Sequence, residues 1–243
     1  MKRPVIVLCG CVILNTVIDM LSLRHPYVSI HLDGHDTYGG GQQHSRNSMM
    51  QRCGCGVIAA TDTLLYLCRY HTGLMPPPFR AFDPAAPLPS QLYDDCIQEM
   101  RHRYFPLIPY AGINGLMLMR GMEHFFRKYH MPFSARWCFS RSGMWSKMEE
   151  MLRKDIPVIM SVGPNFPVLW GKERTSFYVR TPAGYRPSTG ARAHYITVTG
   201  MDESWLRISS WGRLYYLNRL EFEQYVNRHS AGFISNILYI EKK

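Results

Sequence analysis

The sequence lacks several features that would place the chain in a specialised class of protein. It shows no internal repeat with a period of about 20 to 50 residues, which excludes the common solenoid and propeller architectures. It also has no long polar tract, and 46% hydrophobic and 19% charged residues are typical of a globular protein. A chain of 243 residues with this composition is long enough to bury a substantial core.

Acidic residues are few: 18 Asp and Glu stand against 28 Lys and Arg, which gives a formal net charge of +10. Such an excess of positive charge is common in nucleic-acid-binding proteins. The basic residues are scattered, however, and no nucleic-acid-binding module accompanies them. We therefore expect a basic surface without a specific nucleic-acid partner.

Cysteines are not arranged as a disulfide framework, because the seven of them are an odd number without regular spacing. At least one thiol is unpaired within the chain, which fits a reducing compartment and a cytoplasmic location.

Long hydrophobic runs are missing too. The N-terminal segment, residues 1–26, is interrupted by Asn15 and Asp19 and is short for a span of about 20 apolar residues. We expect no integral membrane span, with secretion or membrane tethering through residues 1–20 as the alternative to a cytoplasmic location.

The hydrophobic patterns favour helices in the first part of the chain and strands in the second. Residues 27–33 predict a strand, 34–48 a glycine-rich loop, 75–89 a surface connection and 163–167 a rigid turn. Helices are predicted at 56 to about 70, 90–103, 113–130 and 143–155, and a core strand at 156–162. Short strands are predicted at 176–180, 193–202, 205–212, 213–218 and 235–241, where the character of the chain changes to β around Tyr178. Helices followed by strands are typical of an α+β fold. We expect one domain over 27–243, with a helical subdomain at about 45–155 and a β subdomain at about 156–243.

The segment QRCGCG at 51–56 has three interpretations. A zinc site is disfavoured, because Cys53 and Cys55 have C-x-C spacing and no second pair follows. A disulfide between them would close a strained ring. We therefore predict no metal and no cofactor.

The third interpretation makes Cys55 a nucleophile. At the first turn of a helix its thiolate would be stabilised by free N–H groups and the helix dipole, which predicts a lowered pKa. Gly54 and Gly56 would let backbone amides and substrate approach closely. A buried, unreactive cysteine is the alternative.

A second motif lies far downstream, where HYITVTGMD begins at His194 and ISSWG ends at Gly212. A cysteine that opens a buried helix, a strand that begins with histidine and a Ser-Trp-Gly turn together resemble the papain-like cysteine peptidases. The separation of 139 residues between Cys55 and His194 also lies in the range of about 130 to 150 given for that type. The compact layout is most similar to the bacteriocin-processing (double-glycine leader) peptidase-like group and to related uncharacterised bacterial proteins. The resemblance covers residues 51–70 and 155–218.

This resemblance implies a papain-like fold in which a helical part carries Cys55 and an antiparallel β part carries His194. It also implies that Ser209, at the position of the family's Asn or Asp, orients His194, while Trp211 packs under the site and Gly212 permits the turn. The family's oxyanion glutamine, six residues before the cysteine, is replaced by Met49. Gln51 and Gln42 are the candidate substitutes.

We therefore expect a papain-like cysteine-dependent hydrolase that acts on a peptide or small amide substrate through a Cys55 thiolate and a His194 base. The replacements at Met49 and Ser209 favour an alternative, a weak or inactive binding module of the same fold. An acyltransferase on this fold is a further alternative.

Overall fold

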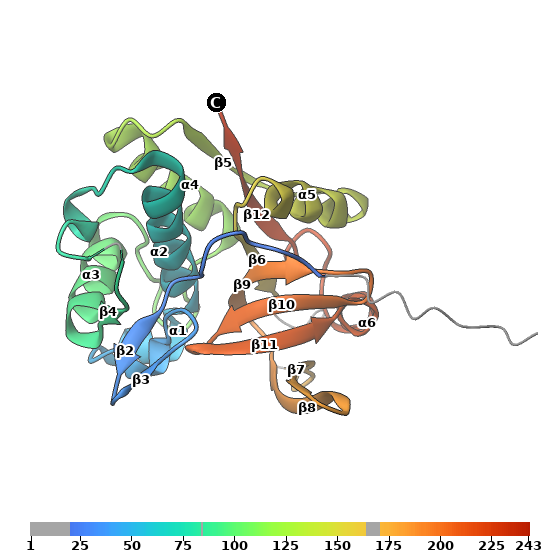
Figure 1. Cartoon of the computed structure of the whole chain (residues 1–243). Coiled ribbons are helices and arrows are strands. Elements are labelled where there is room, and N and C mark those ends of the chain that lie inside the picture. The colour runs from blue at the N-terminus through green and yellow to red at the C-terminus, as the bar shows by residue number, and fades with distance from the viewer. Residues whose placement is uncertain (1–19, 84, 164–170) are drawn as a thin grey trace, which may run out of the picture.

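The computed structural model describes residues 20–83, 85–163 and 171–243 (Figure 1). The interpretations of residues 1–19 and 164–167 therefore lie outside the described residues. The helices are α1 Ser48–Cys53, α2 Cys55–Leu67, α3 Ser90–Arg103, α4 Gly115–Lys128, α5 Arg141–Arg153 and α6 Arg219–His229. The first strands are β1 Leu21–Ser22, β2 Ile30–Leu32, β3 His35–Asp36, β4 Leu88–Pro89, β5 Phe133–Trp137 and β6 Val158–Val162. The later strands are β7 Thr175–Thr181, β8 Gly184–Ala191, β9 His194–Met201, β10 Trp205–Ser210, β11 Arg213–Asn218 and β12 Ile237–Lys242.

Helix α2 lies in the core. Every residue from Gly56 to Leu67 is buried, and a helix that is buried on all sides lies in the core with other elements around it. It packs against β9 and β6 on the sheet side and against α3 and α4 on the helical side. The chain then continues as a π-helical turn over Cys68–Thr72. The first residue of the core helix is therefore held where the helices meet the sheet.

Over the described residues the strands form a nine-stranded antiparallel sheet in the order β5-β12-β6-β9-β10-β11-β7-β8, with β1 also paired to β9. All five residues of β6 are buried, as expected for a strand with both faces covered, and β6 contacts both α2 and α5. A second, three-stranded sheet, β3-β2-β4, lies beside the helices. Figure 1 shows α2, α3 and α4 together on one side of the large sheet.

The architecture is α+β, but helices and strands alternate more than the hydrophobic pattern indicates. Strand β5 joins the large sheet although it lies between α4 and α5, and α6 lies between two strands of the β part. The prediction of a surface connection over 75–89 is wrong in part, because Phe79, Phe82 and Leu88 are buried in the core. These apolar side chains attach the segment to the helical side.

A buried carboxylate secures the far end of α2. Asp155, which is 2% exposed, accepts hydrogen bonds from the Tyr66 hydroxyl at 2.7 Å and from the backbone N–H of Arg24 at 2.6 Å, and its other oxygen lies 2.6 Å from His25 Nδ1. Three positions far apart in sequence are thereby joined, and the residues before β2 are fixed to the core.

None of the helices in the described parts of the chain is long and apolar enough to cross a membrane.

Candidate active site

Cys55 is the first residue of α2, as its flanking glycines indicate. Gly54 separates α1 from α2 and donates its N–H to the carbonyl of Met50 at 2.8 Å. A Cβ atom on Gly54 would lie 2.5 Å from that carbonyl oxygen, so this tight turn requires glycine. The turn places the Cys55 side chain at the N-terminus of the buried helix.

Gly56 allows the start of α2 to approach the start of β9. A Cβ atom there would lie 2.5 Å from Ile113 Cγ2 and 3.1 Å from the Tyr195 ring. The close packing brings the Cys55 thiol into hydrogen-bond contact with the backbone of Tyr195, the residue after His194. The lack of a side chain at position 56 thus brings the two sequence motifs together.

His194 is held on two sides. Its Nε2 atom and the Ser210 hydroxyl oxygen share a hydrogen bond of 2.8 Å. The Trp211 ring stacks on the imidazole, with ring centroids 4.4 Å apart and planes inclined by 20°. His194 is 7% exposed, so these contacts fix a nearly buried imidazole.

The turn between β10 and β11 carries Trp211 in a strained conformation. Trp211 has φ of 51° and Gly212 has φ of 71°, and a two-residue hairpin with both angles positive is a type I′ turn. Glycine adopts this conformation without strain, but a tryptophan does so at a cost of about 1–3 kcal/mol. The stacking on His194 is the contact that this conformation provides.

Ser209, which the resemblance predicts as the orienting residue, directs its hydroxyl to a partner other than His194. Its hydroxyl donates to the Tyr38 carbonyl at 2.8 Å. Ser209 is the cross-strand partner of Thr197, so these two side chains share one face of the sheet. The imidazole of His194, at the first position of β9, instead meets the hydroxyl of Ser210, the next residue along β10. Of the two serines, Ser210 is therefore the one whose hydroxyl is hydrogen-bonded to the imidazole.

Cys55 and His194 line one small cavity of about 20 Å³. A cavity of this size has room for about one water molecule. The other described residues that line it are Gly40, Gln42, Ile58, Ala59, Asp62, Tyr195, Thr197, Ser209, Ser210 and Trp211. The structure thus gathers both predicted motifs, together with Gln42, around a single space.

The electrostatics of this pair differ from the expectation of a low thiol pKa. Part of Cys55 reaches solvent, but burial of the thiol raises its pKa to about 11, and hydrogen bonds from the backbone of Tyr195 and Gly56 oppose that rise only in part. Burial likewise lowers the pKa of His194 to about 3. At neutral pH the resting site therefore holds an uncharged thiol and an uncharged imidazole.

The two glutamine candidates differ in position. Gln42, 9% exposed, lies at the cavity, and its side-chain amide donates to the Gln51 carbonyl at 2.9 Å. Because an amide nitrogen carries two N–H groups, this bond leaves one of them for another acceptor. Gln51 is exposed and is not among the described residues that line the cavity.

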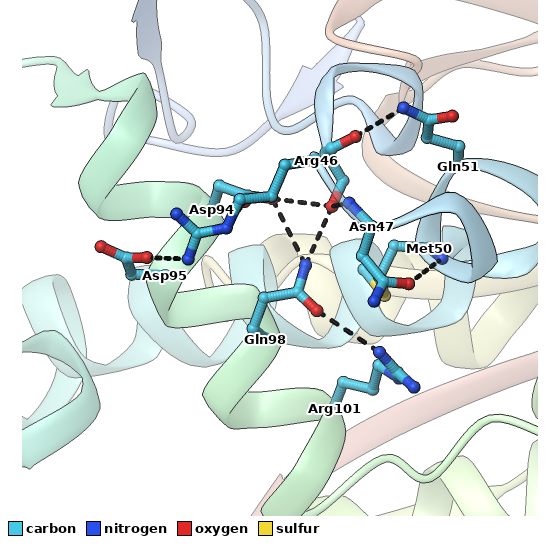
Figure 2. A network of polar contacts seen from close by, with 9 residues as sticks. Arg46, Asn47, Met50, Gln51, Asp94, Asp95, Gln98 and Arg101 are labelled. Carbon is cyan, nitrogen blue, oxygen red and sulfur yellow. Dashed lines mark hydrogen bonds and ion pairs between the residues drawn. The ribbon is translucent and has the colours of Figure 1, made fainter.

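Gln51 belongs instead to a polar network that fastens the segment before α1 to α3 (Figure 2). Its amide donates to the Ser45 carbonyl at 2.7 Å, and the Ser45 hydroxyl donates to Asp94 at 2.7 Å. Arg46 pairs with Asp94 at 3.0 Å and also with Asp95. The structure thus places the Gln51 amide in this network and does not bring Gln51 to the cavity, so of the two glutamine candidates only Gln42 lies beside Cys55 and His194.

Within the described residues no group of three or more His, Cys, Asp or Glu side chains is arranged to hold a metal ion. Cys53 and Cys55 are both free thiols, and Cys53 donates to the Met49 carbonyl at 3.1 Å. Asp202 accepts N–H bonds from Ser204 and Trp205 in the β9–β10 turn, as aspartate commonly does in turns.

Two residues at the site have no signal in the motif pattern. Ser210 follows Ser209, the serine that the resemblance selects, and is identified only by its hydrogen bond to His194 in the folded chain. Asp62 lies inside an apolar helix and is 1% exposed. An acidic residue within an otherwise apolar helix is the sequence signal that would have identified Asp62 as a site candidate.

Comparison of the chain with protein-family models, with curated proteins and with solved structures found no match.

Proposed function

We propose that the chain is a cysteine-dependent hydrolase of the papain-like type that acts on a peptide or amide bond. One observation carries the proposal: Cys55 at the start of α2 and His194 at the start of β9 line the same cavity. The second motif contributes Ser210 and Trp211, which hold the imidazole. A nucleophile, a base and groups that orient the base are the parts that covalent acyl chemistry requires.

The proposed first step starts from uncharged groups. With Nε2 bonded to Ser210, Nδ1 of His194 is the nitrogen that accepts the Cys55 proton while the sulfur attacks the carbonyl carbon. Burial disfavours a thiolate–imidazolium pair in the empty site, so proton transfer accompanies attack rather than preceding it. The imidazolium then protonates the leaving amine as the carbon–nitrogen bond breaks.

The thioester left on Cys55 is hydrolysed by water, with His194 again acting as the base. In both steps negative charge develops on the carbonyl oxygen. The backbone N–H of Cys55 and the second side-chain N–H of Gln42 are the donors at the cavity that we assign to this oxygen.

A binding module of the same fold is the second candidate. The high pKa of the Cys55 thiol favours it, because only the thiolate is a strong nucleophile. Acyl transfer shares the formation of the thioester and differs only in the group that accepts the acyl unit, an amine or thiol instead of water. A nucleophilic amine added to the assay therefore tests for it.

The decisive experiment is a mass-spectrometric cleavage assay on a diverse peptide library with the full chain. Cys55→Ala and His194→Ala should each lower turnover by at least about a hundredfold, the usual scale for loss of a nucleophile or base. Cys53→Ala is the matched control, because that thiol bonds to the Met49 carbonyl and is not among the described cavity residues. Added hydroxylamine should yield hydroxamates if the acyl group transfers to amines.

Turnover that survives Cys55→Ala, or that is lost equally in Cys53→Ala, would contradict the proposal. Peptides that bind without being cleaved would establish the binding module.

A further inference from the structure

A buried carboxylate lies on the same helix as Cys55. Asp62 follows Cys55 by seven residues, so the two side chains lie on one face of α2, about two turns apart. Asp62 is 1% exposed and lines the same cavity as Cys55 and His194. A buried acid in an apolar helix is costly unless its oxygens are bonded, so its partners show what it does.

Both carboxylate oxygens are engaged by other elements. The Tyr93 hydroxyl on α3 donates to Oδ1 at 2.6 Å, and the backbone N–H of Gly40 donates to Oδ2 at 2.8 Å. A Cβ atom on Gly40 would lie 2.9 Å from the Ile58 methyl group and closer still to Tyr93. The backbone at Gly40 thus lies directly against the helix, and Asp62 is the acceptor that holds it there.

The opposite side of this segment is joined to the turn that holds His194. Gly40 accepts from the N–H of Gly212 at 2.9 Å, and the Gln43 amide donates to the Trp211 carbonyl at 2.9 Å. Residues 38–43 therefore bridge the Cys55 helix and the Trp211–Gly212 turn. Gln42 lies within this bridge, two residues after the N–H that Asp62 binds.

We propose that Asp62 is a positioning residue that holds the 38–43 segment on α2 and thereby places the Gln42 amide beside Cys55. The inference rests on the proposed function, in which Gln42 binds the developing oxyanion. Removal of the carboxylate should free this side of the bridge, since the Gly40 N–H then loses its buried acceptor.

The test compares Asp62→Ala with Asp62→Asn in the full chain. Asparagine keeps an oxygen for the Gly40 N–H, and its amide donates to the Tyr93 oxygen, so it preserves the link. In Asp62→Ala, the rate of hydrogen exchange over residues 38–43 should rise at least about tenfold, while exchange in β9 stays unchanged. Iodoacetamide labelling of Cys55 should accelerate. The kcat for peptide cleavage should fall about tenfold, with a smaller change in KM. Asp62→Asn should restore all three to within about threefold of wild type, and the unchanged exchange in β9 distinguishes the result in Asp62→Ala from a general loss of stability.

Tyr93→Phe is the matched control, because it removes the other partner of Asp62 and leaves the Gly40 bond. It should keep residues 38–43 protected. If Asp62→Ala does not fold, hydrogen exchange of the Gly40 amide, measured by NMR in wild type and in Asp62→Asn, decides. Exchange at least about a hundredfold slower than in the unfolded chain in both proteins supports the link, and exchange at the unfolded rate overturns it.

The outcomes separate this inference from the proposed function. If hydrogen exchange of residues 38–43 and iodoacetamide labelling of Cys55 are unchanged in Asp62→Ala, the inference is overturned, whether or not the protein cleaves peptides. Turnover that is retained while exchange increases also overturns it and leaves the hydrolase standing. If wild type cleaves nothing, the hydrolase fails, and exchange with Cys55 labelling alone decides whether Asp62 positions the segment.

Discussion

Replacing Asp62 by asparagine should change how the stability of the fold depends on pH. Burial raises the pKa of this carboxyl from 3.8 to about 7, with the hydrogen bonds from Tyr93 and Gly40 opposing the rise. Between these two values the folded protein retains a proton that the unfolded chain has released. Stability of the wild type therefore falls as pH rises through this window, whereas asparagine has no proton to lose.

The magnitude follows from the two pKa values. Each unit of pKa difference between the folded and unfolded states corresponds to about 1.4 kcal/mol, so the rise from 3.8 to about 7 corresponds to about 4 kcal/mol. Solvent screening is small because Asp62 is 1% exposed. The neighbouring Tyr27, Tyr93 and Cys96 stay uncharged over this range, since burial raises the pKa of each.

His194 acts in the opposite direction. Burial lowers its pKa from 6.5 to about 3, so between these values the unfolded chain binds a proton that the folded protein does not, and stability rises with pH. In wild type the contributions of the two groups oppose each other between about pH 4 and 6.5. In Asp62→Asn only the His194 contribution remains, and stability should rise with pH.

Urea unfolding followed by tryptophan fluorescence at pH 4.5, 5.5, 6.5 and 7.5 measures the effect. The free energy of unfolding of Asp62→Asn minus that of wild type should grow by about 1.4 kcal/mol per pH unit and level off above about pH 7. Glu203→Gln, at an exposed position in the β9–β10 turn, is the control. A difference for Asp62→Asn that is constant with pH would refute the assignment of a buried, protonated carboxyl.

Three further predictions concern the immediate surroundings of the thiol. Iodoacetamide labelling of Cys55 should accelerate about tenfold per pH unit up to about pH 10, because burial raises its pKa to about 11; a plateau below pH 8 would contradict this. Gly56→Ala should destabilise the fold by about 1–3 kcal/mol in thermal unfolding through overpacking, whereas Gly143→Ala, with its nearest neighbour at 3.5 Å, should not. Ser210→Ala should lower kcat by about tenfold or more, and Ser209→Ala should lower it less, because only Ser210 bonds to the imidazole; equal losses would contradict the assignment.

Elements with a strong hydrophobic period could be predicted from sequence. The helix expected at 90–103 is α3, Ser90–Arg103, and the one expected at 113–130 is α4, Gly115–Lys128. Strand β8 could not be predicted, because it is largely exposed, contains Pro187 and pairs with β7 alone at the sheet edge. Such an edge strand carries little of the alternation that identifies a buried one.

The residues of the candidate site likewise differ in whether local sequence patterns predict them. Local signals, two glycines around a cysteine and a histidine that opens an apolar strand, indicated Cys55 and His194. The choice between Ser209 and Ser210 depends on strand pairing, and the register of β10 against β9 shifts between Arg207 and Ile208. A shift of one residue reverses which side chains face the site, and no local pattern reveals it.

The thiol pKa shows a further limit of local reasoning. A helix N-terminus favours the thiolate, which predicts a lowered pKa for Cys55. The effect of burial depends on how tightly Tyr195 and the rest of β9 pack against α2, and here it is the larger. Tertiary packing therefore determines the resting charge of the site.

Covalent capture tests the central claim, that His194 activates Cys55 for attack on a carbonyl, most directly. The full chain is treated at neutral pH with a set of peptidyl acyloxymethyl ketones, which react slowly with ordinary thiols, and the labelled residue is located by mass spectrometry. We predict an adduct on Cys55 that forms at least about a hundredfold more slowly in His194→Ala, with Cys53 unmodified. An adduct that forms equally on Cys53, or on Cys55 at an unchanged rate in His194→Ala, would contradict the claim.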